Sequence, residues 1–482
     1  MDPTLNSPFL GNGDGFTSEA QELIKAINAG SALSGADAGN GFALIPQSLE
    51  QTLVRTTFDD KHVKFWKDIP KEAAFSTVEE YDRLDSYGPE RISAFMPEGD
   101  LPFADDASYS RQNATVKYMG TLRAVSHPMG LVRSIAGDQI ARETQNGTLW
   151  LMRQVEKALF FGSSALVPTQ FDGLLPQLQA AITAGAADAN SLLDRRSTTD
   201  AGLGRSLSQF FLDDLAEQAF SAPNFATIDT CYYSTAAHKN LGVDLINGEG
   251  QAKGSGIRLD VGNNQGGPIK PGWKFSEVAT LFGDIAVNPD VFLNPVGLTE
   301  AQLTDAGVAQ GDATARPGTP SIGVVAEQNV TTGLFGSQTG AYKYIVVAVN
   351  KSGNSVGSAA ATGTVTDGVK SQRLPITKGN NGTPTGYIVY RTAKAGSTFY
   401  EIARIAYSAS PQNWDDINSV IAGTSYAFFL QSSKDVVAYK QLAPFMRVPL
   451  ATIDLRTRWV QLLYGTPVLK APRKIIIVKN VL

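Results

Sequence analysis

The chain has 482 residues, 43% of them hydrophobic and 18% charged, and its 41 basic and 46 acidic residues leave a net charge of -5. This length predicts about three domains, and the composition excludes a disordered tail and a strongly basic DNA-binding protein. The single cysteine, Cys231, excludes an intrachain disulfide, and it forms no metal-ligand cluster with the three scattered histidines. Because the first residues lack the pattern of a secretion signal and no apolar run is long enough to span a bilayer, we expect neither secretion nor membrane anchoring.

Residues 1–60 are predicted to form an N-terminal arm. A short helical pattern opens at Thr17 and closes at Gly30, and the small, polar stretch 31–41 follows it. Neither piece has enough apolar surface to order itself. We therefore expect an arm that lies on a partner.

A long flap is predicted next. Residues 75–82 and 114–119 are typical of strands, and about thirty residues rich in Gly, Pro, Asp and Glu separate them. Loops of that length are usually functional or disordered. The pattern predicts two strands that carry an acidic tip.

The clearest helix is predicted over Gln139–Phe161, where Leu151, Val155 and Leu159 recur at helical spacing and Gly162 follows. An α/β region then extends over residues 206–300. It is predicted to hold a helix at 208–216, strands at 226–229, 285–287 and 291–293, and a glycine-rich loop at 248–267.

Helical periodicity disappears over residues 317–431, where short alternating strands are bounded by Gly, Asn and Pro. The strands expected there are 342–349, 386–391, 400–405 and 425–429. Such spacing predicts a β-sandwich of the immunoglobulin or fibronectin type III kind. The segment Leu455–Leu482 is expected to pair with strands before the sandwich, which makes the sandwich an insertion.

No coherent enzyme site is present in the sequence. The glycine-rich loop has neither the GxxxxGK[ST] spacing nor the GxGxxG spacing of phosphate-binding loops. Cys231 and His238 lack the flanking pattern of a nucleophile and its base. Adjacent carboxylates are more simply explained as solvated turns, because sequence neighbours on a strand point apart; they occur at Asp59–Asp60, Asp105–Asp106, Asp213–Asp214 and Asp415–Asp416. We expect no catalytic residue, no metal and no cofactor.

The last segment is strongly basic. From Leu455 to Leu482 the sequence has six basic residues and no acidic one. Such a strip suits either nucleic acid or salt bridges to an acidic segment of a neighbour, and charge alone does not choose between them.

Several short motifs follow one another in a characteristic order. The quoted segments are Phe65-Trp66-Lys67-Asp68-Ile69, Ser76-Thr77-Val78, Val116-Lys117-Tyr118, Phe171-Asp172-Gly173-Leu174, Leu442 to Ala451, Tyr464-Gly465, Ala471-Pro472-Arg473-Lys474 and Lys479-Asn480-Val481. Over nearly the whole chain this order resembles the major capsid proteins of tailed bacteriophages, which have the Hong Kong 97-type fold. It is most similar to those of large contractile-tailed phages of the Twort type, which carry an immunoglobulin-like insertion.

The resemblance implies an α+β fold divided into named parts. These are an N-terminal arm (1–60), an E-loop flap with flanking strands (61–130), a peripheral domain with a spine helix (131–200), an axial domain (201–316), the inserted sandwich (317–431) and a return to the axial and peripheral domains (432–482). The sandwich is expected on the outer surface of the shell.

The same resemblance implies the function and the partners. The subunits would form hexamers and pentamers of an icosahedral head around double-stranded DNA, which they contact without sequence specificity. Scaffolding protein, portal and a decoration protein are the other expected partners, with assembly in the bacterial cytoplasm and final residence in the virion. The contact residues it implies are Arg91, Glu98, Asp100, Asp105 and Asp106 at the flap, and Lys470, Arg473 and Lys474 near the C-terminus.

Two other classes of protein are weighed against this prediction. An encapsulin-like nanocompartment shell has the same fold and encloses an enzyme. A phage tail or adhesin protein would use the sandwich as its working module, but the order of flap, long helix and terminal strands would then have no explanation.

Overall fold

The structure is a computed structural model that describes residues 59–88, 95–96, 98–101, 106–131, 138–247, 275–329, 331–408, 410–451 and 455–482. The predicted arm up to residue 58 and the glycine-rich loop at 248–267 lie outside this part of the chain. Phe58–Gly130 and Ile140–Leu482 form one compact unit, to which the elements below belong.

The flap is a two-stranded antiparallel ribbon of β2 (Val78–Ser86) and β3 (Ser108–Thr115), in which Val78 lies opposite Thr115. The ribbon confirms the predicted pairing, but its second strand ends earlier than expected. Val116 is buried, and β4 (Lys117–Ser126) begins directly after it in a different sheet. The predicted strand 114–119 is therefore divided between two sheets at this buried residue.

A four-stranded sheet has the order β1-β21-β22-β4. Its other strands are β1 (Lys71–Ala73), β21 (Val437–Pro449) and β22 (Arg456–Leu469). The pairing of β22 with β4 confirms that the C-terminal segment returns to strands that precede the sandwich.

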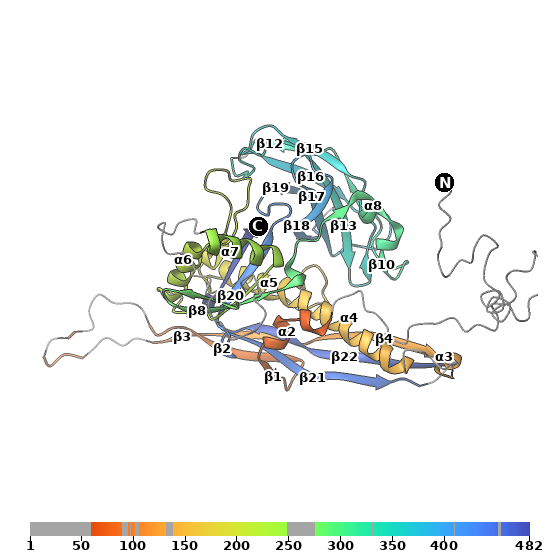
Figure 1. Cartoon of the computed structure of the whole chain (residues 1–482), viewed down its shortest axis with the longest axis horizontal. Coiled ribbons are helices and arrows are strands. Elements are labelled where there is room, and N and C mark those ends of the chain that lie inside the picture. Colours follow the sequence, from red (N-terminus) through yellow and green to blue (C-terminus); the bar gives the residue numbers. More distant parts are fainter. Residues whose placement is uncertain are drawn as a thin grey trace, which may run out of the picture. The chain divides into compact units, whose positions relative to one another are not determined.

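The predicted long helix is confirmed as α4 (Gln139–Phe161), which lies along β4 and β22 in Figure 1. Leu151, Val155 and Leu159 are buried, as their spacing requires. A Cβ atom on Gly147 would lie 2.1 Å from Oε1 of Gln461 in β22. Glycine at this position therefore lets the helix approach the sheet closely.

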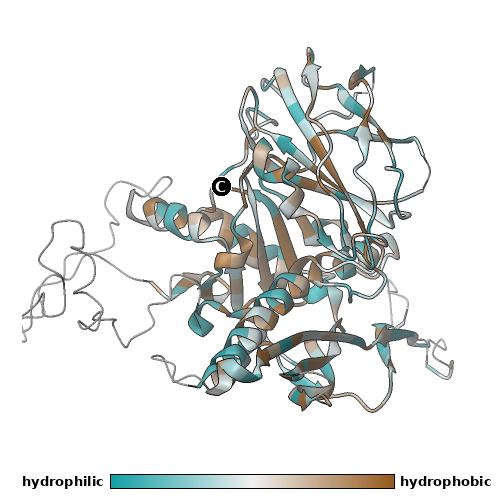
Figure 2. Cartoon of the chain, turned by 90° about the vertical axis from the view of Figure 1, so that its right-hand side faces the viewer, coloured by the Kyte–Doolittle hydropathy of each residue, from teal (hydrophilic) through white to brown (hydrophobic). Residues whose placement is uncertain are grey.

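A six-stranded sheet has the order β5-β23-β20-β6-β8-β7 and includes parallel and antiparallel pairs. Its strands are β5 (Leu192–Asp194), β6 (Thr230–Tyr233), β7 (Glu277–Thr280), β8 (Gly283–Pro289), β20 (Ser425–Leu430) and β23 (Ile475–Val481). Figure 2 shows hydrophobic strands at the centre, with more hydrophilic helices beside them.

Two short elements of this region differ from the prediction. The strand expected at 226–229 is β6, which starts at Thr230. The strand expected at 291–293 is the 3-10 helix η4 (Val291–Leu293), because the side chain of Asp290 accepts a hydrogen bond from the backbone N–H of Phe292 and caps a helical turn.

The helices around these sheets are mostly short. They are η2 (Asp60–His62), α2 (Phe65–Asp68), α3 (His127–Leu131), α5 (Leu174–Thr183), η3 (Ala189–Ser191), α6 (Gln209–Phe220), α7 (Thr235–Asn247), α8 (Glu300–Thr304), η5 (Ala306–Val308) and η6 (Pro472–Lys474). An aromatic cluster of Phe65, Phe160, Tyr232 and Phe428 joins α2, α4 and the six-stranded sheet.

Between residues 298 and 416 the chain forms two further sheets. The seven-stranded sheet contains β9 (Leu298–Thr299), β10 (Gln310–Gly311), β13 (Gly340–Asn350), β14 (Gly353–Asn354), β15 (Ala361–Val365), β17 (Gly386–Thr392) and β18 (Thr398–Ala406). The four-stranded sheet contains β11 (Ser321–Ile322), β12 (Ala326–Gln328), β16 (Ser371–Thr377) and β19 (Gln412–Asp416).

The strand expected at 425–429 is present as β20, but it does not belong with these sheets. It pairs with β23 and β6 in the six-stranded sheet. Alternation within a strand shows which side chains share a face but not which strand lies beside it. The prediction that this strand belongs to the sandwich was therefore wrong.

Candidate assembly surface

The residues that might suggest catalysis have structural roles. Cys231 is buried in β6, and burial raises the pKa of its thiol. His238 Nδ1 lies 2.8 Å from the hydroxyl of Tyr233 and is hydrogen-bonded to it. The neighbours Asp415 and Asp416 point apart, toward Arg373 and Arg391 respectively.

No group of His, Cys, Asp and Glu side chains among the described residues is arranged to hold a metal ion. No helix in that part of the chain is long and apolar enough to cross a membrane.

The flap ribbon has no buried residue on either of its faces. Its outer face carries the exposed apolar side chains of Val78, Leu84 and Tyr109 beside Arg111, which forms a salt bridge to Asp82. An isolated two-stranded ribbon is only marginally stable in water. This ribbon is therefore suited to pack against another surface.

The base of the flap is held to its own subunit. The hydroxyl of Tyr81 donates a hydrogen bond to the carbonyl of Leu469, and the side chain of Glu79 accepts from the N–H groups of Phe75 and Ser76. A cleft of about 430 Å³ lies here, lined by β2, β3, α5 and the end of β22. These contacts fix the direction in which the ribbon leaves the subunit.

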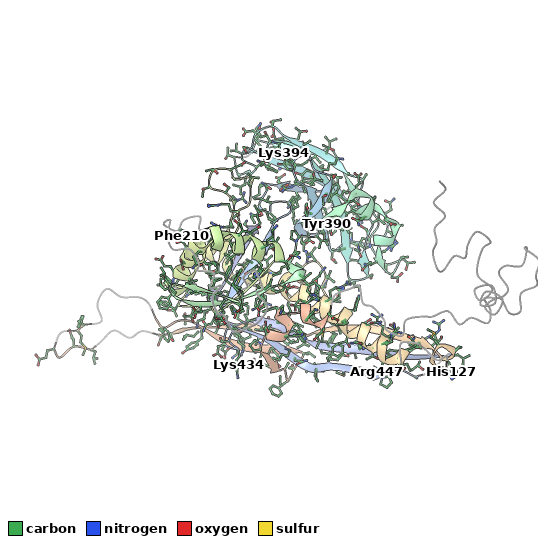
Figure 3. The ribbon with its side chains drawn as sticks, viewed as in Figure 1. His127, Phe210, Tyr390, Lys394, Lys434 and Arg447 are labelled. Carbon is green, nitrogen blue, oxygen red and sulfur yellow. The ribbon has the colours of Figure 1, made fainter. Side chains whose placement is uncertain are left out.

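Among the described residues, the four-stranded sheet has one covered and one uncovered face. Trp459, Gln461 and Leu463 of β22 are buried, and the side-chain amide of Gln461 donates to the Thr144 carbonyl of α4, so they face the helix. Figure 3 labels Arg447 near the end of this sheet, where its guanidinium lies 4.7 Å from the ring of Trp459.

The middle of the opposite face of the same sheet is apolar, and Arg456 and Arg458 lie on this face at one end of β22. Tyr118 and Leu122 of β4 are 58% and 60% exposed, and Val448 of β21 is 38% exposed. Strand register adds partly buried neighbours on that face, namely Met446, Val460, Leu462 and Tyr464. We call these seven residues the open sheet face. Contiguous apolar surface of this kind marks an interaction site, because sheets bury their apolar faces against another layer.

The sequence-predicted contact residues are placed as follows. Glu98, Asp100 and Asp106 are exposed, whereas Arg91 and Asp105 lie outside the described residues. Nζ of Lys470 lies 2.8 and 2.9 Å from the two carboxylate oxygens of Glu72 in the same chain.

Arg473 and Lys474 lie in η6 and are half-buried. Burial by itself would raise the pKa of Asp85 near the end of β2, but hydrogen bonds from Ser110 and Arg83 and the charges of Arg83 and Arg473 hold it below its ordinary value. Arg473 thus has an electrostatic partner within its own subunit. Contacts of these residues with neighbouring subunits stay a prediction.

Sequence reasoning missed a buried carboxyl group. Glu156 lies off the apolar stripe of α4, a position that predicts a solvent-facing side chain, yet it is fully buried. Its carboxylate accepts backbone N–H groups of Lys64, Phe65 and Trp66 at 2.7 to 2.9 Å. Partners so distant along the chain leave no signal in the local sequence.

Known proteins are similar to this chain along its length. No protein-family model matches it. A protein of Enterococcus phage phiEF24C is 26% identical over 484 residues, covering 97% of this chain and 96% of the relative. The proteins of Staphylococcus phages S25-3 and K are each 23% identical over 475 residues, covering 96% of this chain and 95% of the relative. All three are named as major capsid proteins.

Solved structures with a similar arrangement have lower identity. The capsid of a native GTA particle has a TM-score of 0.48 at 9% identity and covers 94% of this chain and all of the other. The capsid of phage XM1 gives 0.44 at 8% identity, covering 90% and 97%. The encapsulin of Synechococcus elongatus gives 0.42 at 8% identity, covering 91% and 94%.

The similarity to the sequence relatives covers at least 96% of this chain. It extends at low identity to the capsid protein of Staphylococcus phage K, which is a distant homologue. The chain is a major capsid protein of the tailed-phage kind, a structural protein of the virion that forms the head shell and is not an enzyme.

Proposed function

We propose that this chain builds an icosahedral head of hexamers and pentamers with the Hong Kong 97-type fold, and that the head encloses double-stranded phage DNA. The order of flap, long helix α4, six-stranded sheet and returning strands β22 and β23 supports this. The observation that carries the proposal is the pair of uncovered surfaces on one subunit, the flap ribbon and the open sheet face. Each needs a partner, and in a shell of identical subunits the nearest partner is another copy.

The flap ribbon of one copy is the proposed cover for the open sheet face of the next. The ribbon offers Val78, Leu84 and Tyr109, and the sheet offers Tyr118 and Leu122. We also propose that the charged groups of the flap meet basic groups of a neighbouring subunit. The flap groups are Arg91, Glu98, Asp100, Asp105 and Asp106, and the groups on the neighbour are Lys470, Arg473 and Lys474. Contacts with DNA, scaffolding protein, portal and decoration protein belong to the same proposal.

The proposed parts keep the predicted boundaries except at the sandwich. They are an arm (1–60), an E-loop (61–130), a peripheral domain (131–200), an axial domain (201–316) and a returning segment. We propose that residues 317–416 are an immunoglobulin-like insertion of the Twort type on the outer shell surface. Its core of Tyr344, Val346, Leu374 and Tyr387 from both sheets supports a sandwich.

Electron microscopy of the purified full-length chain tests assembly. We expect closed shells or hexameric and pentameric rings. The variant Arg473→Glu/Lys474→Glu should reduce their yield if these groups meet an acidic flap, whereas normal shells from that variant would remove the charge pairing. A fibre or a small ring of another symmetry from the wild-type chain would contradict the proposed function.

Deletion tests the inserted sandwich. Replacing 317–416 by a short glycine-serine linker should leave shells of normal diameter, because all of the four-stranded sheet and most of the seven-stranded sheet are removed together and only the two-residue strands β9 and β10 remain. The deletion removes Val347 and Val349, against which Leu166 and Val167 pack. We therefore expect the variant to have a lower melting temperature.

The matched control for this deletion removes 317–431. That variant also loses β20, which lies between β23 and β6, and it should not fold. Complete absence of shells from the shorter deletion, with the subunit folded by circular dichroism, would show instead that the sandwich holds neighbouring subunits together.

A further inference from the structure

The fully buried Glu156 side chain lies beside a second fully buried carboxyl group, Asp290. The two side chains are hydrogen-bonded to each other. Oδ1 of Asp290 accepts the N–H of Phe292 at 2.8 Å, while its buried Oδ2 accepts from no N–H or hydroxyl group of the described residues. Two carboxylates are both acceptors, so the contact between them needs a proton.

That proton belongs most naturally on Oδ2 of Asp290. The oxygens of Glu156 already accept three backbone N–H groups, from Lys64, Phe65 and Trp66, and a charged carboxylate is the better acceptor for them. Oδ2 of Asp290 has no such donors. The protonated Asp290 then donates to Glu156 as a fourth donor.

The surroundings do not neutralise a second negative charge. The charged and titratable groups that face the pair are Lys64 from the α2 segment, Lys71 from β1 and Tyr232 from β6, and Asp68 lies next to the last two. Nζ of Lys71 is instead bonded to the carbonyl of Trp66, and Asp68 to the hydroxyl of Tyr232. Neither carboxyl of the pair forms a salt bridge within the described part of the chain.

We propose that Glu156 and Asp290 form a protonation-dependent latch, which holds the Lys64–Trp66 segment on the long helix and weakens when the shared proton is lost. The segment lies directly before β1 and the flap strand β2. Loss of the proton places two charges side by side in the interior, and separating them releases the segment that leads into the flap.

The direction of the pH dependence follows from burial. Desolvation first, and then the neighbouring Asp290, raise the pKa of Glu156 to about 8, and burial also raises the pKa of Asp290. Because the two carboxyl groups share one proton, the raised pKa belongs to the pair and not to either residue alone. The folded protein therefore keeps a proton that an unfolded carboxyl group releases at about pH 4. The stabilisation is complete at low pH and is lost as the pH rises to about 8.

Hydrogen exchange on the full-length chain tests the latch. Protection factors of the Lys64, Phe65 and Trp66 amides, corrected for the intrinsic rate, should fall by up to about tenfold for each pH unit as the pH rises toward about 8, because the opened segment releases one proton that the closed pair keeps. Above about 8 the fall should level off, because both states have then lost the proton. Amides of Trp459 and Leu463 in β22 should show no such loss and serve as the internal reference.

The variant Asp290→Asn separates the latch from general loosening. Its amide donates to Glu156 without a titrating proton and still accepts from Phe292, so protection of the three amides should stay constant with pH. The same pH-dependent loss in Asp290→Asn as in the wild type would overturn the latch. If this variant does not fold, the wild-type protein decides alone, since constant protection of its three amides across pH 6–10 would also overturn it.

Discussion

Replacing Leu122 by aspartate is expected to prevent shell assembly and leave the subunit folded. Leu122 is 60% exposed on the open sheet face, so the free subunit tolerates the charge. In a shell the proposed contact would bury an unpaired carboxylate at a cost of several kcal/mol. Because 1.4 kcal/mol is a factor of ten in an equilibrium constant, shell yield should fall by at least about 100-fold.

Sedimentation and electron microscopy measure this yield, and circular dichroism reports the fold of the subunit. The matched control is Val324→Asp, which places the same charge on an 87% exposed valine outside the open sheet face. Val324→Asp should assemble normally. Normal shells from Leu122→Asp would show that the open sheet face is not covered in the head.

Replacing Arg391 by methionine should cause the largest loss of folding stability. Arg391 is 1% exposed, and its guanidinium lies 2.5 Å from Oδ2 of Asp416 and 2.5 Å from Oδ1 of Asn418. Without it Asp416 keeps only the Tyr344 hydroxyl and the Asn418 N–H as donors. Breaking a buried ion pair from one side costs about 3–5 kcal/mol.

Urea unfolding of the full-length chain, followed by near-ultraviolet circular dichroism, measures the loss. Arg373→Met is the matched control, since its pair with Asp415 is largely solvated and should contribute little. The double variant Arg391→Met/Asp416→Leu should recover most of the stability because no buried charge is left alone. Equal effects of Arg391→Met and Arg373→Met would contradict this account.

The long helix could be predicted from the sequence, whereas the open sheet face could not. The long helix at Gln139–Phe161 was predictable to the residue because its stripe and the following Gly162 are local signals. The exposed leucine and tyrosine of the open sheet face carry no such signal. Alternation in β4 indicates two faces, but only the position of α4 decides which of them stays uncovered.

The sandwich shows the same division. Strands β13, β17 and β18 were predictable from alternation and turn residues. The strand at 425–429 has an equally strong pattern, yet it pairs with β23 and β6. Its hydrogen-bonding partners lie in other parts of the chain, so no property of the strand itself selects them.

The sequence by itself determined the longer elements, their order and the class of protein, because helical and strand periodicity and the order of motifs are properties of the chain. Tertiary structure alone decided which strands share a sheet, which apolar face is left open, and that Glu156 and Asp290 meet in the interior. These depend on contacts between distant segments, whose energies arise only when folding brings the segments together.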